Sequence, residues 1–219
     1  MMIDAVCMKG GNPMKLQIVV FDGFDELDAI APFEALRRAE EAGADLHAEL
    51  VTQDGADEAT AFYGLRVRPT SRLWRADADP ADEKPGIVIV PGGGWNHPSP
   101  TGARAQAQRG ELPAALAALH AQGAIIAGVC TGAMLLAAAG LLTGRPATTH
   151  HLAHDELRAA GADLVAARVV DDGDMITASG VTSGLDLALW IVERFASPQI
   201  ATKVESRLEY ERRGTVWRR

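Results

Sequence analysis

Cys130 is the residue whose position is best suited to chemistry. It lies between a continuous apolar stretch at residues 124–129 and a helix-forming stretch at residues 131–139, with Gly128 and Gly132 on either side. Small neighbours permit the sharp strand-to-helix turn, or nucleophile elbow, from which a reactive side chain projects. Unpaired N–H groups at the start of the helix would also favour the thiolate, the nucleophilic form of cysteine. We therefore expect Cys130 to be a reactive thiol with a lowered pKa.

Two other segments could serve this thiol. Three glycines at residues 92–94 follow an apolar run, and their N–H groups, together with that of Thr131, could form an oxyanion pocket. Acidic side chains cluster where the first predicted helix begins, at Asp25, Glu26 and Asp28. For Asp25 and Glu26 we prefer a plain role in capping the helix, because acids stabilise helix N-termini.

Strands and helices that alternate along the chain must position these residues. The apolar pattern predicts strands at residues 16–21, 48–52, 86–90 and 124–129, short strands within 61–70 and at 147–150, a hairpin over 168–178, and helices at 27–42, 111–122, 131–139, 153–160, 182–194 and 198–209. Such alternation indicates an α/β fold with a mostly parallel sheet and helices on both faces. The turns at 22–28, 91–96 and 129–131 each follow a strand, so they should meet at the carboxyl edge of the sheet.

Composition limits the class of protein. The chain has 219 residues, of which 47% are apolar, and we expect a flexible leader at residues 1–14, a single domain at 15–210 and a polar tail at 211–219. The net charge of −8 argues against nucleic acid as a partner. Two cysteines form no disulfide framework, and no apolar run is long enough for a membrane span or a secretory signal. We therefore expect a cytoplasmic protein with reduced thiols and no membrane partner.

Four segments together resemble the ThiJ/PfpI superfamily, a branch of the class I glutamine-amidotransferase-like fold: DGFDELDAIAPFEAL, VPGGG, GVCTGAMLLAAAGLLTGRPATTHH and SGVTSGLDLALWIVE. The resemblance runs from about Met14 to about Phe195. Within the superfamily the chain is most similar to isocyanide hydratases and to the sensor domains of AraC-type regulators. This resemblance implies a flavodoxin-like three-layer sandwich that forms a homodimer and acts on a small molecule.

The resemblance also implies roles for individual residues. Cys130 matches the nucleophile, and Asp28 matches the acid that hydrogen-bonds the cysteine sulfur. Thr131 matches the residue after the cysteine, which contacts the site. Gly92 and Gly93 fall on the oxyanion loop.

Other positions leave alternatives open. Asp186 matches a second acid near the site in the hydratase branch, or it is a solvated helix carboxylate. His150 could approach the sulfur from a neighbouring strand, or it is a structural or surface histidine. Thr131 stands where protease-like and glyoxalase-like branches often have His, which counts against peptidase activity. His151 stands where hydratase-like sequences often have Trp, which leaves the substrate pocket undefined.

Three functions fit these residues. The first is hydration of an isocyanide to an N-formamide by the Cys130 thiolate, with Asp28 as the proton donor. The second is a stand-alone small-molecule sensor or an oxidative-stress sensor and protective protein, in which Cys130 is oxidised. The third is glyoxalase or deglycase chemistry on 2-oxoaldehydes. None of them needs a cofactor, and the histidines lack the partners expected of a metal site.

Overall fold

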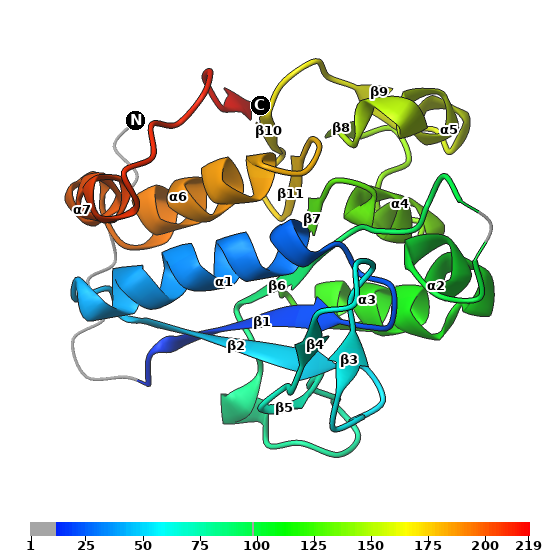
Figure 1. Cartoon of the computed structure of the whole chain (residues 1–219), viewed down its shortest axis with the longest axis horizontal. Helices are drawn as coiled ribbons and strands as arrows, with labels where there is room; N and C mark the ends of the chain where they lie inside the picture. The colour runs from blue at the N-terminus through cyan, green and yellow to red at the C-terminus, as the bar shows by residue number, and fades with distance from the viewer. Residues whose placement is uncertain (1–11, 98) are drawn as a thin grey trace.

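An eight-stranded sheet forms the centre of the computed structural model, which describes residues 12–97 and 99–219 (Figure 1). The strand order is β12-β10-β11-β7-β6-β1-β2-β5, and every neighbouring pair is parallel except β10–β11. The strands are β1 (Met14–Val20), β2 (Leu46–Thr52), β5 (Ser71–Arg72), β6 (Ile87–Val90), β7 (Ile125–Val129), β10 (Val169–Asp171), β11 (Met175–Ala178) and β12 (Trp217–Arg218). Residues 1–11 of the expected leader, including Cys7, lie outside the described residues.

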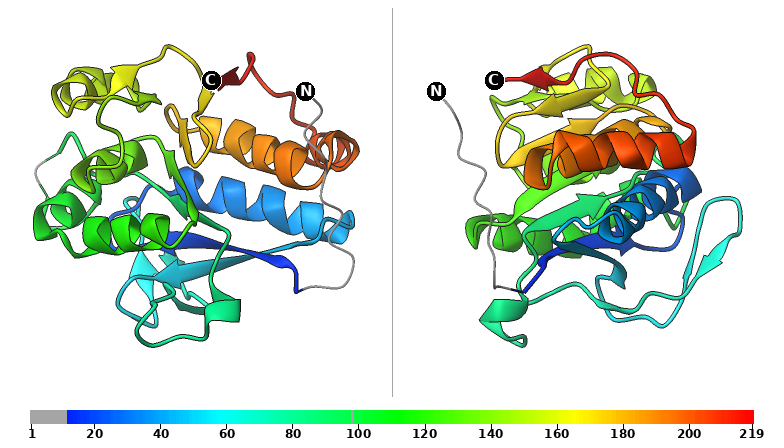
Figure 2. Two further views of the ribbon diagram at one scale, coloured as in Figure 1. Left: turned by 180° about the vertical axis from the view of Figure 1, so that it is seen from behind. Right: turned by 90° about the vertical axis from the view of Figure 1, so that its left-hand side faces the viewer.

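Helices cover both faces of this sheet. On one face α1 (Glu26–Glu41), α6 (Ser183–Phe195) and α7 (Pro198–Leu208) pack together, and Figure 1 shows α1 and α6 side by side. On the other face lie α2 (Ala103–Arg109), α3 (Glu111–Ala121) and α4 (Gly132–Ala138), as the view from behind in Figure 2 shows. The expected three-layer, flavodoxin-like sandwich is therefore confirmed. Among the described residues no helix is long and apolar enough to cross a membrane.

Two small lobes extend from the layers. One is a hairpin of β3 (Ala59–Thr60) and β4 (Arg66–Val67), which precedes the short turn η1 (Ala81–Glu83). The other pairs β8 (Pro146–Ala147) with β9 (Asp163–Leu164) and carries η2 (His151–Ala153) and α5 (His154–Ala159). Neither two-stranded sheet joins the central one. The strand expected at 147–150 is thus confined to β8, and residues 148–150 form a loop.

Burial explains why the central strands read as continuous apolar runs. Every residue of β6 and the last five residues of β1 are buried, because helices cover both faces of a parallel sheet. The main difference from the sequence prediction is at the C-terminus, where a polar tail was expected. Instead, β12 pairs in parallel with β10 and forms the edge of the sheet. Backbone hydrogen bonds form this strand. The side chains of Trp217 and Arg218 show no pattern that would predict it.

Candidate functional site

Cys130 occupies the turn between β7 and α4, at the carboxyl edge of the sheet. Its φ angle is +56°, in the left-handed region that few residues other than glycine adopt. Its N–H donates to the carbonyl oxygens of Ala178 at 3.0 Å and Ser179 at 3.2 Å, and its own carbonyl accepts from the Thr149 hydroxyl at 2.8 Å. These bonds hold the strained backbone in place, as expected of a nucleophile elbow.

The small residues beside Cys130 allow the elbow to pack on the sheet. A Cβ on Gly132 would overlap the carbonyl oxygen of Val90 at the end of β6. A Cβ on Gly128 would lie 2.8 Å from the nitrogen of Ala133, inside the contact distance of real side chains. Helix α4 can therefore start this close to β6 and β7 only because both positions are glycine.

Asp28 brings a carboxyl group to the thiol from helix α1. It lies in the first turn of α1 and is fully buried. Its Oδ2 accepts from the N–H of Gly92 at 3.0 Å. Asp28 and the Cys130 thiol also act on each other's pKa, so the two side chains lie close together in the site. Oδ1 has no well-directed hydrogen-bond partner among the described residues, so the carboxyl is held at one oxygen only.

The glycine loop is hydrogen-bonded to both the acid and the elbow. The N–H of Gly92 is bonded to Asp28, and that of Gly93 donates to Thr131 Oγ1 at 3.1 Å. Both donors are therefore engaged inside the protein, where they align the acid and the elbow. The N–H that lowers the pKa of the Cys130 thiol is that of Thr131, the residue after the cysteine.

Burial reverses the expectation of a low thiol pKa. Desolvation is the largest cause that raises the pKa of the Cys130 thiol, and the negative charges of Asp28 and Asp25 add to it, while the Thr131 N–H opposes them. Desolvation also raises the pKa of Asp28 well above its usual value. Because both pKa values are raised, the site disfavours ionisation of the thiol and the carboxyl group at the same time. The pair therefore holds its protons more tightly than the two free groups would.

His150 lies at the start of η2 and makes no hydrogen bond to Cys130 among the described contacts. Its Nδ1 accepts from the N–H of Leu152 at 3.3 Å, and its ring is 4.4 Å from that of His151. The ring also fills the space over Gly180. Burial, together with the neighbouring histidines, lowers the pKa of His150, so its imidazole is neutral at pH 7.

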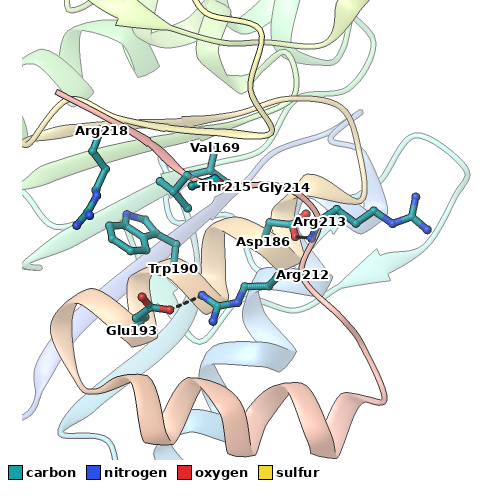
Figure 3. Close-up of a pocket in the computed structure, with 10 residues that line it drawn as sticks. Val169, Asp186, Trp190, Glu193, Arg212, Arg213, Gly214, Thr215 and Arg218 are labelled. Carbon is teal, nitrogen blue, oxygen red and sulfur yellow. Dashed lines mark hydrogen bonds and ion pairs between the residues drawn. The ribbon is translucent and has the colours of Figure 1, made fainter.

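The hydrogen-bond partners of Asp186 are Arg168 and residues of the C-terminal segment. Its Oδ2 accepts from Arg168 Nε at 2.8 Å and from the Tyr210 hydroxyl at 3.1 Å, and its Oδ1 accepts from the N–H of Arg213 at 2.9 Å. It borders a cavity of about 270 Å³ between α6 and the C-terminal segment, where Figure 3 shows it beside Arg213. Asp186 is thus a buried anchor for that segment and differs from a solvated helix carboxylate.

Asp25 and Thr149 are residues whose part in the site the sequence analysis missed. Asp25 caps α1 as expected, since its Oδ1 accepts from the N–H of Leu27 at 3.2 Å, but its charge also acts on Asp28 and Cys130. Thr149 supports the carbonyl of the elbow from a buried position. The only sequence signal for Asp25 was its spacing, one helical turn before Asp28.

Comparison with known proteins gives a consistent family. The model of the DJ-1/PfpI family matches residues 14–194. Isonitrile hydratase from Pseudomonas putida is 33% identical over 199 residues, which cover 90% of this chain and 79% of that protein. A deglycase from Thermococcus kodakarensis is 29% identical over 75% of this chain and 89% of its own length. A solved ThiJ/PfpI family protein from Pseudomonas syringae aligns with a TM-score of 0.77 and 28% identity, over 93% of this chain and 78% of that one.

Proposed function

Because this chain belongs to the DJ-1/PfpI family, we propose that it is a cysteine-dependent enzyme that hydrates a small isocyanide to an N-formamide. The observation that carries the proposal is the buried pair of Asp28 and Cys130. A carboxyl group whose pKa is raised by burial can hold a proton and deliver it to carbon, and the sulfur beside it can attack the same carbon. The identity to isonitrile hydratase supports this choice of substrate.

The first half of the reaction forms a covalent intermediate. Proton transfer from Cys130 to Asp28 gives a thiolate and a neutral carboxyl, without adding a net charge to the dry site. The sulfur attacks the terminal carbon of R–N≡C, and the Asp28 proton passes to that carbon. The product is a thioimidate, R–N=CH–S–Cys130, and Asp28 is left as a carboxylate.

The second half consumes one water. Asp28 takes a proton from the water as the oxygen adds to the thioimidate carbon, and it then gives this proton to the nitrogen. Asp28 next removes the hydroxyl proton as the C=O bond forms and the sulfur departs. R–NH–CHO is released, and thiolate and neutral carboxyl are restored. The sum is R–NC plus H₂O giving R–NH–CHO, with no redox partner.

The alternative functions receive less support from the site. Oxidative sensing favours an accessible thiol of low pKa, whereas Cys130 is 6% exposed and burial raises its pKa. Glyoxalase or deglycase activity is supported by the similarity to the Thermococcus kodakarensis protein, but no His follows the cysteine.

The setting of the enzyme is part of the same proposal. We expect it to act in the cytoplasm, where a lone thiol stays reduced, and as a homodimer, as the resemblance implies. Apolar side chains that are exposed in the single chain could be covered by a second copy, among them Phe62, Tyr63 and Leu152.

The direct test is formamide production from cyclohexyl isocyanide by the purified protein. Wild type should turn over, and Cys130→Ala should lose at least about 10³-fold in kcat/KM, because no other group can form the thioimidate. Cys7→Ser is the matched control, since it removes the only other thiol, and it should keep wild-type activity. No turnover by wild type, or full turnover by Cys130→Ala, would exclude this reaction. Turnover of methylglyoxal in place of the isocyanide would establish the glyoxalase alternative.

A further inference from the structure

Asp25 and Asp28 are tied to the same residue of the glycine loop. Asp25 is the N-cap of α1, and its own N–H donates to the carbonyl oxygen of Gly92 at 2.9 Å. The N–H of Gly92 in turn donates to Asp28 Oδ2 at 3.0 Å. Residues three apart at the start of a helix lie on the same side. One loop residue therefore fixes two acids next to the Cys130 thiol.

This arrangement replaces a common helix-capping pattern. An acid three residues after the N-cap ordinarily reaches back to the N–H of the N-cap residue. Here the Gly92 carbonyl has taken the N–H of Asp25, so the Asp28 side chain is released toward Cys130. Close approach of the loop makes this possible, because a Cβ on Gly93 would overlap the nitrogen of Asp25. Asp28 is therefore free of the usual capping contact and lies beside the thiol.

The two acids differ in environment. Asp28 is fully buried, whereas Asp25 is partly exposed and accepts a hydrogen bond from the helix N-terminus. Burial raises the pKa of both carboxyl groups, but that of Asp28 rises much further. Environments that separate two carboxyl groups in this way usually give them different protonation states. Asp25, which is partly exposed and accepts an N–H of the helix N-terminus, is accordingly the more readily ionised of the two acids.

We propose that Asp25 is a positioning residue of the thiol site: its carboxyl group, held beside Asp28 through Gly92, keeps negative charge next to the pair of Asp28 and Cys130. Like charge nearby disfavours a second negative charge, and the effect is strong where water is excluded. The charge of Asp25 acts on both members of the pair. The proposal concerns the ionisation of the site and holds whichever substrate the enzyme takes.

Other titratable groups around Asp25 are accounted for. Glu26, on the same turn, acts on Asp25, and its Oε1 accepts from the N–H of Tyr63 at 2.8 Å. His150 faces Asp25 from the start of η2, and burial together with the neighbouring His151 and His154 lowers its pKa. Cys130 is affected by Asp25 and Asp28, whereas Glu26 is not among the groups that shift its pKa.

The test is a pH titration of the Cys130 thiolate by its ultraviolet absorbance, in a Cys7→Ser background that leaves one thiol. Asp25→Asn should move the midpoint to lower pH by about half a unit or more, a threefold or larger gain in thiolate below the midpoint. Asparagine caps helices as well as aspartate does, so the thermal midpoint should change by no more than about 2 °C. Asp25→Ser, a neutral cap of another size, should reproduce the shift.

Glu26→Gln is the matched control, because it removes an acid from the same helical turn and keeps an acceptor for the Tyr63 N–H. It should shift the thiol midpoint much less than Asp25→Asn does. Unchanged titration in Asp25→Asn, or an equal shift in Glu26→Gln, would overturn the proposal. Because the titration uses no substrate, its outcome is independent of whether the protein hydrates isocyanides.

Discussion

Asp28 is a buried carboxyl group that, among residues 12–97 and 99–219, lacks the cationic partner that usually accompanies burial of an acid. The groups that act on it among the described residues are the Gly92 N–H, the Cys130 thiol and the charge of Asp25. One of its oxygens has no directed partner. Such a group favours the neutral form, which suits a proton donor but opposes folding at any pH where the unfolded chain would ionise it.

The stability of the Asp28→Asn variant relative to wild type should therefore depend on pH. The folded-state pKa of Asp28 is raised from 3.8, so its contribution is fully present below pH 3.8 and is lost as the pH rises through the folded-state pKa. Asparagine does not titrate and keeps an acceptor for the Gly92 N–H. Urea unfolding should show that the unfolding free energy of Asp28→Asn, relative to that of wild type, increases from pH 5 to pH 8. A gap that stays constant or shrinks would contradict a raised pKa.

At the scale of elements, the elbow depends on close contact between α4 and the end of β6. Gly132→Ala would place a methyl group onto the Val90 carbonyl oxygen, which is backbone and cannot swing aside. We expect a loss of about 1–3 kcal/mol in unfolding free energy and a fall in activity, because Cys130 would move relative to Asp28. Chemical denaturation and the isocyanide assay measure the two effects.

The Gly140→Ala variant distinguishes the effect of backbone strain from the effect of the steric overlap that Gly132→Ala introduces. Gly140 has a φ of +74° at the end of α4, and a Cβ there would meet nothing within 4 Å. This variant should lose about 1 kcal/mol from strain alone and keep its activity. Equal losses of activity in both variants would mean that the stability of α4, and not its distance from β6, controls the site.

These contacts also show how far the sequence could be interpreted. The apolar runs of β1, β6 and β7 and the glycines around Cys130 follow from local pattern, so the layered fold and the elbow could be predicted. The direction of the thiol pKa could not, because it is set by burial in the folded chain and by the charge of Asp28, about 100 residues earlier in the chain. For the same reason the partner of the Gly92 N–H was not visible.

The same limit applies to the whole molecule at its C-terminus. The stretch from Arg212 to Arg219 is polar, and its partners are distant in sequence: β10 beside β12, and Asp186 and Glu193 on α6. The segment lies over Trp190, which is only 7% exposed, and Arg218 stacks on that ring at 5.3 Å. In this way the end of the chain completes the edge of the sheet and covers the outer part of α6 (Figure 3).

Two neighbouring arginines, Arg212 and Arg213, allow the packing of the C-terminal segment on α6 to be tested. Arg212 pairs with Glu193 at 2.5 Å and with Glu205 at 2.8 Å, and thereby connects the segment to α6 and α7; all three side chains are less than a third exposed. Arg213 contacts Asp186 through its backbone N–H, which alanine would keep. Arg212→Ala should lower the unfolding free energy by about 1 kcal/mol and shift the Trp190 emission to the red, whereas Arg213→Ala should stay within about 0.5 kcal/mol of wild type. Neither should alter the Cys130 titration, since the segment contacts α6 and β10 and not the elbow. Equal destabilisation by both variants would show that the general positive charge of the segment, and not the paired guanidinium of Arg212, holds the end of the chain in place.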